Sequence, residues 1–347
     1  MNATMLRGRR VSGAGLALLL AMLVPGAAAQ VISLVGSGSN LPSPLYDAWV
    51  QRYNQRNPKV QVHYQGLGTS ESIALITAGS GDFGGGEVPI SDQQLRTAKV
   101  KIVHVPTVLA AIVPIYNVPG SSNPLRFSGD VLARIFLGTI KNWDDPAIAR
   151  LNPGAKLPHL GITVVHRNPG KGSNYILSDF LSKTSPEWRA RIGKTPSPTW
   201  PLGETAERGQ DMVSKVKSTA GALGYVELGF ALHDPGVRAG SVQNASGEFV
   251  SASPESMTAA CLAMQKSMAA DLRVSLTNAP GKDSYPITSF TWLYVPAGGL
   301  KPERAGALSD FLQWALSSGQ EIAREQGYAP LPAPVLSQAK AAAGQVK

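Results

Sequence analysis

The sequence of 347 residues contains a single cysteine, Cys261, and this scarcity excludes several kinds of protein. One cysteine allows neither an intramolecular disulfide nor a cluster of thiolate metal ligands. No cysteine follows the N-terminal leader described below, so we expect no lipid anchor there. Cys261 stands in an apolar stretch of helical pattern, residues 257–268, and we expect it to be a thiol buried in the core.

Charged residues are also scarce, at 16% of the chain, whereas hydrophobic residues make up 43%. This balance is typical of a packed globular protein and argues against a disordered one. The formal net charge of +9 is spread along the chain without a run of Lys and Arg, so we expect no nucleic-acid partner. Attraction of a small anion fits the charge better.

Long apolar runs are absent, and the N-terminal one is too short to span a membrane. Arginines within residues 7–10 precede this apolar core at 16–24, and small residues at 27–29 offer a cleavage site. The pattern predicts a secretory signal peptide over residues 1–29. General secretion is favoured, and twin-arginine export stays open, because an arginine pair is present in a poor context. We therefore expect a periplasmic protein.

Glycine and proline are plentiful, with 36 and 26 residues, and they separate strand-type runs from helical patterns. The alternation of strand, glycine turn and helix is typical of an α/β architecture with parallel sheets. The expected strands are residues 31–35, 60–64, 102–115, 162–165, 224–226 and 287–295. The expected helices are 45–53, 73–78, 175–181 and 304–326, and residues 131–151 are expected to form a mixed helical region. Residues 82–87 are expected to form a loop.

Three turns between an expected strand and an expected helix carry hydroxyl or amide side chains. They are Ser39-Asn40, Thr69-Ser70 and residues 171–173. Such a turn leaves backbone N–H groups unsatisfied and places the positive end of the helix dipole at its opening. Arg167 precedes the third turn and can direct two hydrogen bonds at an oxyanion. Plain N-capping explains any one turn, but the set favours an anion site.

The first two turns and Arg167 lie in segments that resemble the periplasmic phosphate-binding proteins of Pst-type ABC importers, the PstS family. The segments are residues 36–46, 64–70, 82–89, 91–92, 138–148, 151–153, 165–167, 221–227 and 285–289. The resemblance implies a two-lobed binding-protein fold of the type II kind. Each lobe would be a mainly parallel sheet flanked by helices, with hinge strands between the lobes. Residues 30–108 and 284–347 would form lobe 1, and residues 109–283 lobe 2.

The resemblance implies that the chain binds inorganic phosphate in the cleft between the lobes and delivers it to the permease subunits of an ABC transporter. It implies a monomer with no catalysis, no cofactor and no metal. The implied phosphate ligands are Asn40, Leu41, Thr69, Glu87, Arg167, Lys171, Gly172 and Ser173.

Several of these residues depart from the family pattern. Asn40 stands where Thr is common, Leu41 where Phe is common, Glu87 in place of Asp, and Lys171 in place of Ser. Pro169 stands where an acid often steadies the arginine.

A carboxylate in an anion site would select phosphate over sulfate. Phosphate near neutral pH carries a proton that Glu87 can accept, whereas sulfate carries none, so two acceptors would face each other. The alternative for Glu87 is a solvated acid in a loop.

Three other functions stay open. The chain could bind another oxyanion, such as arsenate, or an organic phosphate. A secreted phosphatase would need a nucleophile with a base, or clustered metal ligands. Ser173 and His166 are near each other in sequence, but no G-x-S-x-G motif is present and the five histidines lack metal-ligand spacing. The third alternative function is that of an extracellular adhesin or scaffold protein.

Overall fold

One long strand, β4 (Ile102–Tyr116), runs through the middle of the main sheet and connects its two halves. We analysed a computed structural model, which describes residues 31–120, 124–268 and 271–346 together with Met1. The first part of β4 pairs antiparallel with β12 (Thr288–Pro296), and the last part with β8 (Ala222–Glu227). Nearly every residue of β4 is buried, which explains its continuous apolar sequence.

The strands on either side of this centre run parallel to one another. On one side β2 (Val60–Gly66), β1 (Ile32–Gly38) and β3 (Phe83–Gly86) are parallel, and β3 pairs with β12. On the other side β8 is parallel to β6 (Thr163–Arg167), which is parallel to β7 (Glu204–Ala206). The strand order among the described residues is therefore β2-β1-β3-β12-β4-β8-β6-β7.

The remaining strands are short. β9 (Arg238–Ala239) pairs with β4, and a small sheet has the order β11 (Phe249–Val250), β10 (Ser241–Gln243), β5 (Arg126–Phe127).

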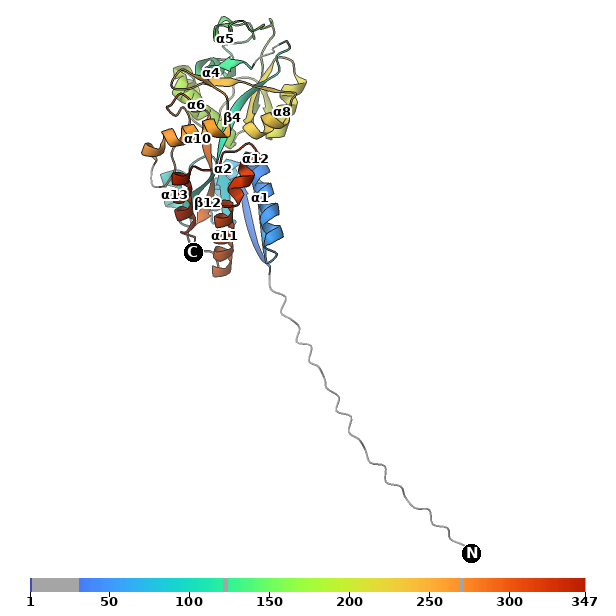
Figure 1. The fold of residues 1–347 in the computed structure, drawn as a ribbon, viewed down its shortest axis with the longest axis vertical. Coiled ribbons are helices and arrows are strands. Elements are labelled where there is room, and N and C mark those ends of the chain that lie inside the picture. The colour runs from blue at the N-terminus through green and yellow to red at the C-terminus, as the bar shows by residue number, and fades with distance from the viewer. Residues whose placement is uncertain (2–30, 121–123, 269–270, 347) are drawn as a thin grey trace. The chain divides into compact units, whose positions relative to one another are not determined.

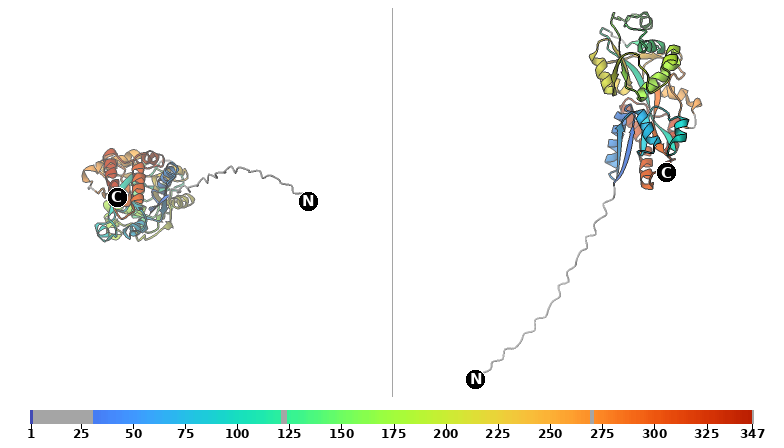
Figure 2. Two further views of the ribbon diagram at one scale, coloured as in Figure 1. Left: turned by 90° about the horizontal axis from the view of Figure 1, so that it is seen from below. Right: turned by 180° about the vertical axis from the view of Figure 1, so that it is seen from behind.

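Helices connect the strands in both halves, and segments far apart in sequence pack together (Figures 1 and 2). They are α1 (Ser43–Arg56), α2 (Thr69–Thr77), α3 (Asp92–Thr97), α4 (Gly129–Phe136), α5 (Pro146–Leu151), α6 (Gly172–Thr184), α7 (Pro186–Arg191), α8 (Gly209–Ser218), α9 (Leu228–His233), α10 (Pro254–Ala263), η1 (Gln265–Ser267), α11 (Pro302–Ala315), α12 (Gly319–Glu325) and α13 (Ala333–Ala343). For example, the Trp49 indole of α1 donates to the Gly319 carbonyl of α12 at 2.8 Å.

Two sequence-based expectations about local structure are wrong. Residues 82–87 were expected to form a loop, but Phe83–Gly86 form the buried strand β3. Its glycines allow close packing, since a Cβ on Gly86 would lie 2.4 Å from Thr69 Cγ2. Residues 304–326 contain two helices instead of one, because α11 ends at Ala315 and a turn at residues 316–318 precedes α12. The helix α13 beyond them was not expected.

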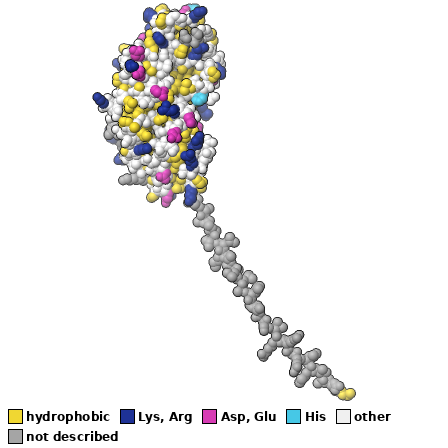
Figure 3. All heavy atoms as spheres, in the orientation of Figure 1, with side chains coloured by type: hydrophobic (Ala, Val, Ile, Leu, Met, Phe, Trp, Pro, Cys, Tyr) yellow, Lys and Arg dark blue, Asp and Glu magenta, His cyan; other side chains and the backbone are white. Residues whose placement is uncertain are grey.

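Other expectations about the core are confirmed. The apolar face of α1 is buried, and so is Cys261 in α10, where burial raises the thiol pKa to about 12. Charges of both signs are interspersed over the face drawn in Figure 3. Within the described ranges, no helix is long and apolar enough to cross a membrane.

Residues 31–347 form one compact unit. The predicted signal peptide lies outside the described residues, and the predicted lobe boundaries stay a prediction.

Candidate functional site

Three of the predicted phosphate ligands meet where β3, α2 and α6 come together. A Cβ added to Gly172, the first residue of α6, would lie 1.7 Å from Glu87 Oε2 and 2.9 Å from Thr69 Oγ1. Glu87 directly follows β3, and Thr69 is the first residue of α2. Only a residue without a side chain fits at position 172, so the glycine is required by close approach. The structure therefore brings Thr69, Glu87 and Gly172 into contact.

The turns before α2 and α6 also touch each other. The Ser70 backbone N–H donates to the Gly170 carbonyl at 3.1 Å. The Lys171 ammonium lies 3.5 Å from the position of a Cβ on Gly68, whose φ of +116° favours glycine. Two helix N-termini, each with backbone N–H groups free of helical partners, are thus close together.

Glu87 is fully buried, which excludes the alternative of a solvated loop acid. The Thr69 hydroxyl donates to its Oε2 at 3.1 Å. Burial raises the pKa of Glu87 to about 8, although hydrogen bonds from the Ser39 and Thr69 hydroxyls lower it in part. The carboxyl is therefore mainly protonated at neutral pH, and it can donate a hydrogen bond as well as accept one.

Arg167, at the end of β6, is buried and held by two acidic residues. Its Nη1 donates to Glu227 Oε1 at 3.5 Å, and its Nη2 donates to the Glu207 carbonyl at 2.9 Å. Glu227 thus supplies the acid that Pro169 does not. Burial raises the pKa of Glu227, and the Arg167 charge opposes that rise.

Three residues of the site carry buried polar atoms without a hydrogen-bond partner. In the part of the chain that the structure describes, seven buried side-chain N or O atoms lack a hydrogen-bond partner. Three of them are Glu87 Oε1, Arg167 Nε and Glu227 Oε2. Each costs about 1–3 kcal/mol while it stays unpaired. The site therefore offers a free donor on Arg167 and a free acceptor on Glu87.

The other predicted ligands lie around these residues. Ser173 is buried in the first turn of α6, and Lys171 is buried just before it. The Leu41 N–H donates to the Ser39 hydroxyl at 3.1 Å, and the Asn40 amide oxygen lies over Gly66. In the first turn it is therefore the Ser39 hydroxyl that reaches Glu87.

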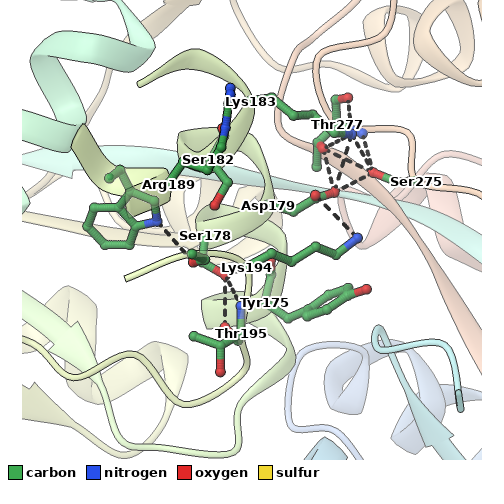
Figure 4. Close-up of polar contacts among 12 residues, drawn as sticks. Tyr175, Ser178, Asp179, Ser182, Lys183, Arg189, Lys194, Thr195, Ser275 and Thr277 are labelled. Atoms are coloured by element: carbon green, nitrogen blue, oxygen red, sulfur yellow. Dashed lines mark hydrogen bonds and ion pairs between the residues drawn. The ribbon is translucent and has the colours of Figure 1, made fainter. Parts of the chain in front are cut away.

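Helix α6 is anchored by a polar cluster around Asp179 (Figure 4). Thr277 Oγ1 donates to Asp179 Oδ2 at 2.7 Å, Ser275 donates to the same oxygen, and Lys194 lies 3.2 Å from Oδ1. Although burial opposes the shift, the nearby lysines hold the pKa of Asp179 below its usual value. A cavity of about 430 Å³, lined in part by Glu87, lies beside this cluster. The cluster fixes the helix whose N-terminus faces Glu87.

Sequence reasoning missed Glu207, Glu227 and Tyr225 as parts of the site, and it placed Ser39 in the first turn but not among the ligands. The Tyr225 hydroxyl accepts from the Arg167 backbone N–H at 3.0 Å. Tyr225 and Glu227 both lie in the segment 221–227, and this signal could have indicated them.

The alternative of catalysis gains no support from the geometry. The His166 ring stacks on Trp200 with ring centroids 4.9 Å apart, and no hydrogen bond among the described residues joins it to Ser173. The described residues also hold no cluster of His, Cys, Asp or Glu suited to a metal ion.

Comparison with known proteins agrees with this fold. Residues 24–318 match the family described as "PBP superfamily domain", so the chain has the two-lobed α/β fold of that superfamily. The phosphate-binding protein PstS of Pasteurella multocida is 36% identical over 328 residues, covering 94% of each chain. PstS of Methanocaldococcus jannaschii is 32% identical and covers 85% of this chain and 82% of its own. The chain belongs to the PstS family.

Solved structures show the same fold at lower sequence identity. A phosphate-binding protein from Stenotrophomonas maltophilia superposes with a TM-score of 0.68 at 17% identity, covering 90% of this chain and 94% of its own. An ABC-type phosphate transport receptor from Vibrio cholerae superposes with a TM-score of 0.59 at 17% identity, covering 86% of this chain and 100% of its own.

Proposed function

We propose that this chain binds inorganic phosphate between Glu87 and Arg167 and serves as the substrate receptor of a phosphate ABC importer. The observation that carries the proposal is a pair of complementary buried atoms without partners, Arg167 Nε and Glu87 Oε1. Glu227 links the two residues, because it bonds to Arg167 and its charge acts on the pKa of Glu87. A protonated phosphate has the matching groups, because an ionised oxygen accepts from the arginine and a P–OH donates to the carboxyl. The names of the relatives support the same ligand.

The remaining contacts follow from the positions of the turns. Backbone N–H groups at the start of α6, near Gly172 and Ser173, point toward an anion bound there and place the helix dipole behind it. Thr69 and Lys171 add a hydroxyl and an ammonium. Asn40 and the Leu41 N–H complete the proposed set, after a rearrangement that releases Leu41 from Ser39.

The wider role follows from the family. The protein is proposed to act in the periplasm as a monomer and to deliver phosphate to membrane permease subunits, with no chemical step of its own. Two lobes, one of residues 30–108 and 284–347 and the other of 109–283, would close on the ion through β4 and β12. Contacts between Ser70 and Gly170, and between Gly172 and Glu87, would form on closure.

Calorimetric titration with phosphate, arsenate and sulfate tests the proposal. We expect one phosphate per chain. Arg167→Lys should weaken binding by about 2–5 kcal/mol, because lysine keeps the charge but loses the Nε donor that the rigid guanidinium holds in place. Arg191→Lys is the matched control, since Arg191 forms an exposed pair with Glu187 on α7. An affinity of Arg167→Lys within about threefold of the unmodified protein would refute the assignment of Arg167.

A further inference from the structure

Lys171 introduces a cation where the family pattern has a neutral serine, and the structure shows how its charge is balanced. The Lys171 side chain is about nine-tenths buried. Its ammonium lies over the turn at Gly68 that precedes α2, and its own backbone caps α6. An unbalanced cation at this position would attract every small anion that enters the site.

Glu207 provides the balance. Its Oε1 accepts from Lys171 Nζ at 2.5 Å, and its Oε2 accepts from the Asn168 amide at 2.5 Å. Its carbonyl accepts from Arg167 Nη2, so one residue contacts both cations of the site. Burial opposes the shift, but the hydrogen bonds from Lys171 and Asn168 hold the pKa of Glu207 below its usual value. The carboxylate is therefore ionised at neutral pH and neutralises Lys171.

We propose that Glu207 is a specificity-determining residue that acts through Lys171, an inference that rests on the proposed function. By pairing with Lys171, Glu207 keeps the site from favouring the more highly charged anion. A cation stabilises a bound anion in proportion to the anion's charge. Under mildly acidic conditions sulfate is a dianion and phosphate is mostly a monoanion, so a released Lys171 charge stabilises sulfate more.

The variant Glu207→Gln tests this role, because the amide keeps the size of the side chain and can still accept from Asn168. Half of the Glu207 side chain is exposed, so the fold does not depend on its burial. The matched control is Glu204→Gln in the preceding strand β7. Glu204 forms an exposed pair with Lys215 at 3.2 Å, so the control changes the net charge equally but leaves Lys171 paired.

We expect the ratio of sulfate to phosphate affinity, measured by calorimetry at mildly acidic pH and fixed salt, to rise about tenfold in Glu207→Gln, equivalent to about 1.4 kcal/mol. Glu204→Gln should leave the ratio unchanged. In a Lys171→Met background, Glu207→Gln should also leave it unchanged, because the effect passes through the ammonium.

Two results would overturn the inference. One is a ratio in Glu207→Gln within about twofold of the unmodified protein. The other is an equal change of the ratio with and without Lys171. Failure of the unmodified protein to bind phosphate is a different outcome, because it would refute the proposed function itself.

Discussion

Sulfate binding should depend on pH through Glu87, whereas phosphate binding should not. Burial raises the pKa of Glu87 to about 8. Below that pH the neutral carboxyl can donate a hydrogen bond to a fully ionised oxygen, so the site can bind sulfate. Above it the carboxylate repels sulfate, but it still accepts the proton that phosphate carries. Selection of phosphate over sulfate is therefore weakest at neutral and acidic pH and sharpens under alkaline conditions.

The magnitude follows from proton linkage. Above the pKa, binding of each sulfate requires uptake of one proton by Glu87, so the sulfate affinity should fall about tenfold per pH unit, or about 1.4 kcal/mol. Between pH 8, where half of Glu87 is already ionised, and pH 9.5, the loss is about sixteenfold. The phosphate affinity should change by only a few fold over the same interval, because the complex keeps the proton of the ligand.

Calorimetric titrations from pH 6 to pH 9.5 at constant ionic strength measure both curves. Glu87→Gln provides the comparison, because the amide does not titrate and donates at every pH. In that variant the steep loss of sulfate affinity should disappear. Sulfate and phosphate affinities that change in parallel with pH in the unmodified protein would refute this role of Glu87.

Three further predictions follow from the same contacts. Between an unfolded pKa near 4.5 and the folded pKa of about 8, folded Glu87 keeps a proton that the unfolded chain has released, so stability falls as pH rises. In chemical unfolding, the free energy of unfolding of Glu87→Gln should therefore rise relative to that of the unmodified protein from pH 5 to pH 8, by about 3 kcal/mol at pH 7. An equal difference between the two proteins at pH 5 and at pH 8 would contradict this. Gly172→Ala should weaken phosphate binding at least about tenfold, because its Cβ would lie 1.7 Å from Glu87 Oε2, whereas Gly161→Ala, with nothing within 4 Å, should bind normally. Small-angle scattering should give a smaller radius of gyration with phosphate than without, and an unchanged radius at saturation would indicate a preformed pocket.

The sequence predicted those features that local pattern determines. A few consecutive residues are enough to predict the apolar face of α1, the buried strand β4 and the glycine turns before α2 and α6. The strand β3 could not be predicted from the sequence, because a run of glycines is typical of a loop unless the neighbouring strands are known. It is a strand because it pairs with β1 and β12, and it contains glycines because Thr69 and Ser72 pack where side chains would be.

The site was predictable only where the family motifs reach it. Glu87 was found in this way, whereas Thr69 and Gly172 also lie in turns that the strand-turn-helix pattern indicated. The contact among the three residues depends on the tertiary structure. Glu227 and Glu207 are distant from Arg167 in sequence, and only the pairing of β6 with β7 and β8 brings them beside it. The replacement of the usual acid by Pro169 signalled that Arg167 needs another partner, but its identity depends on tertiary structure.

A crystal structure of the protein grown with phosphate tests the central claim most directly. The account predicts one phosphate bound with an ionised oxygen within hydrogen-bond distance of Arg167 Nε and a second oxygen facing Glu87 Oε1. It also predicts that the ion lies at the N-terminus of α6. Phosphate bound elsewhere on the chain, or no phosphate between Arg167 and Glu87 at saturating concentration, would contradict it.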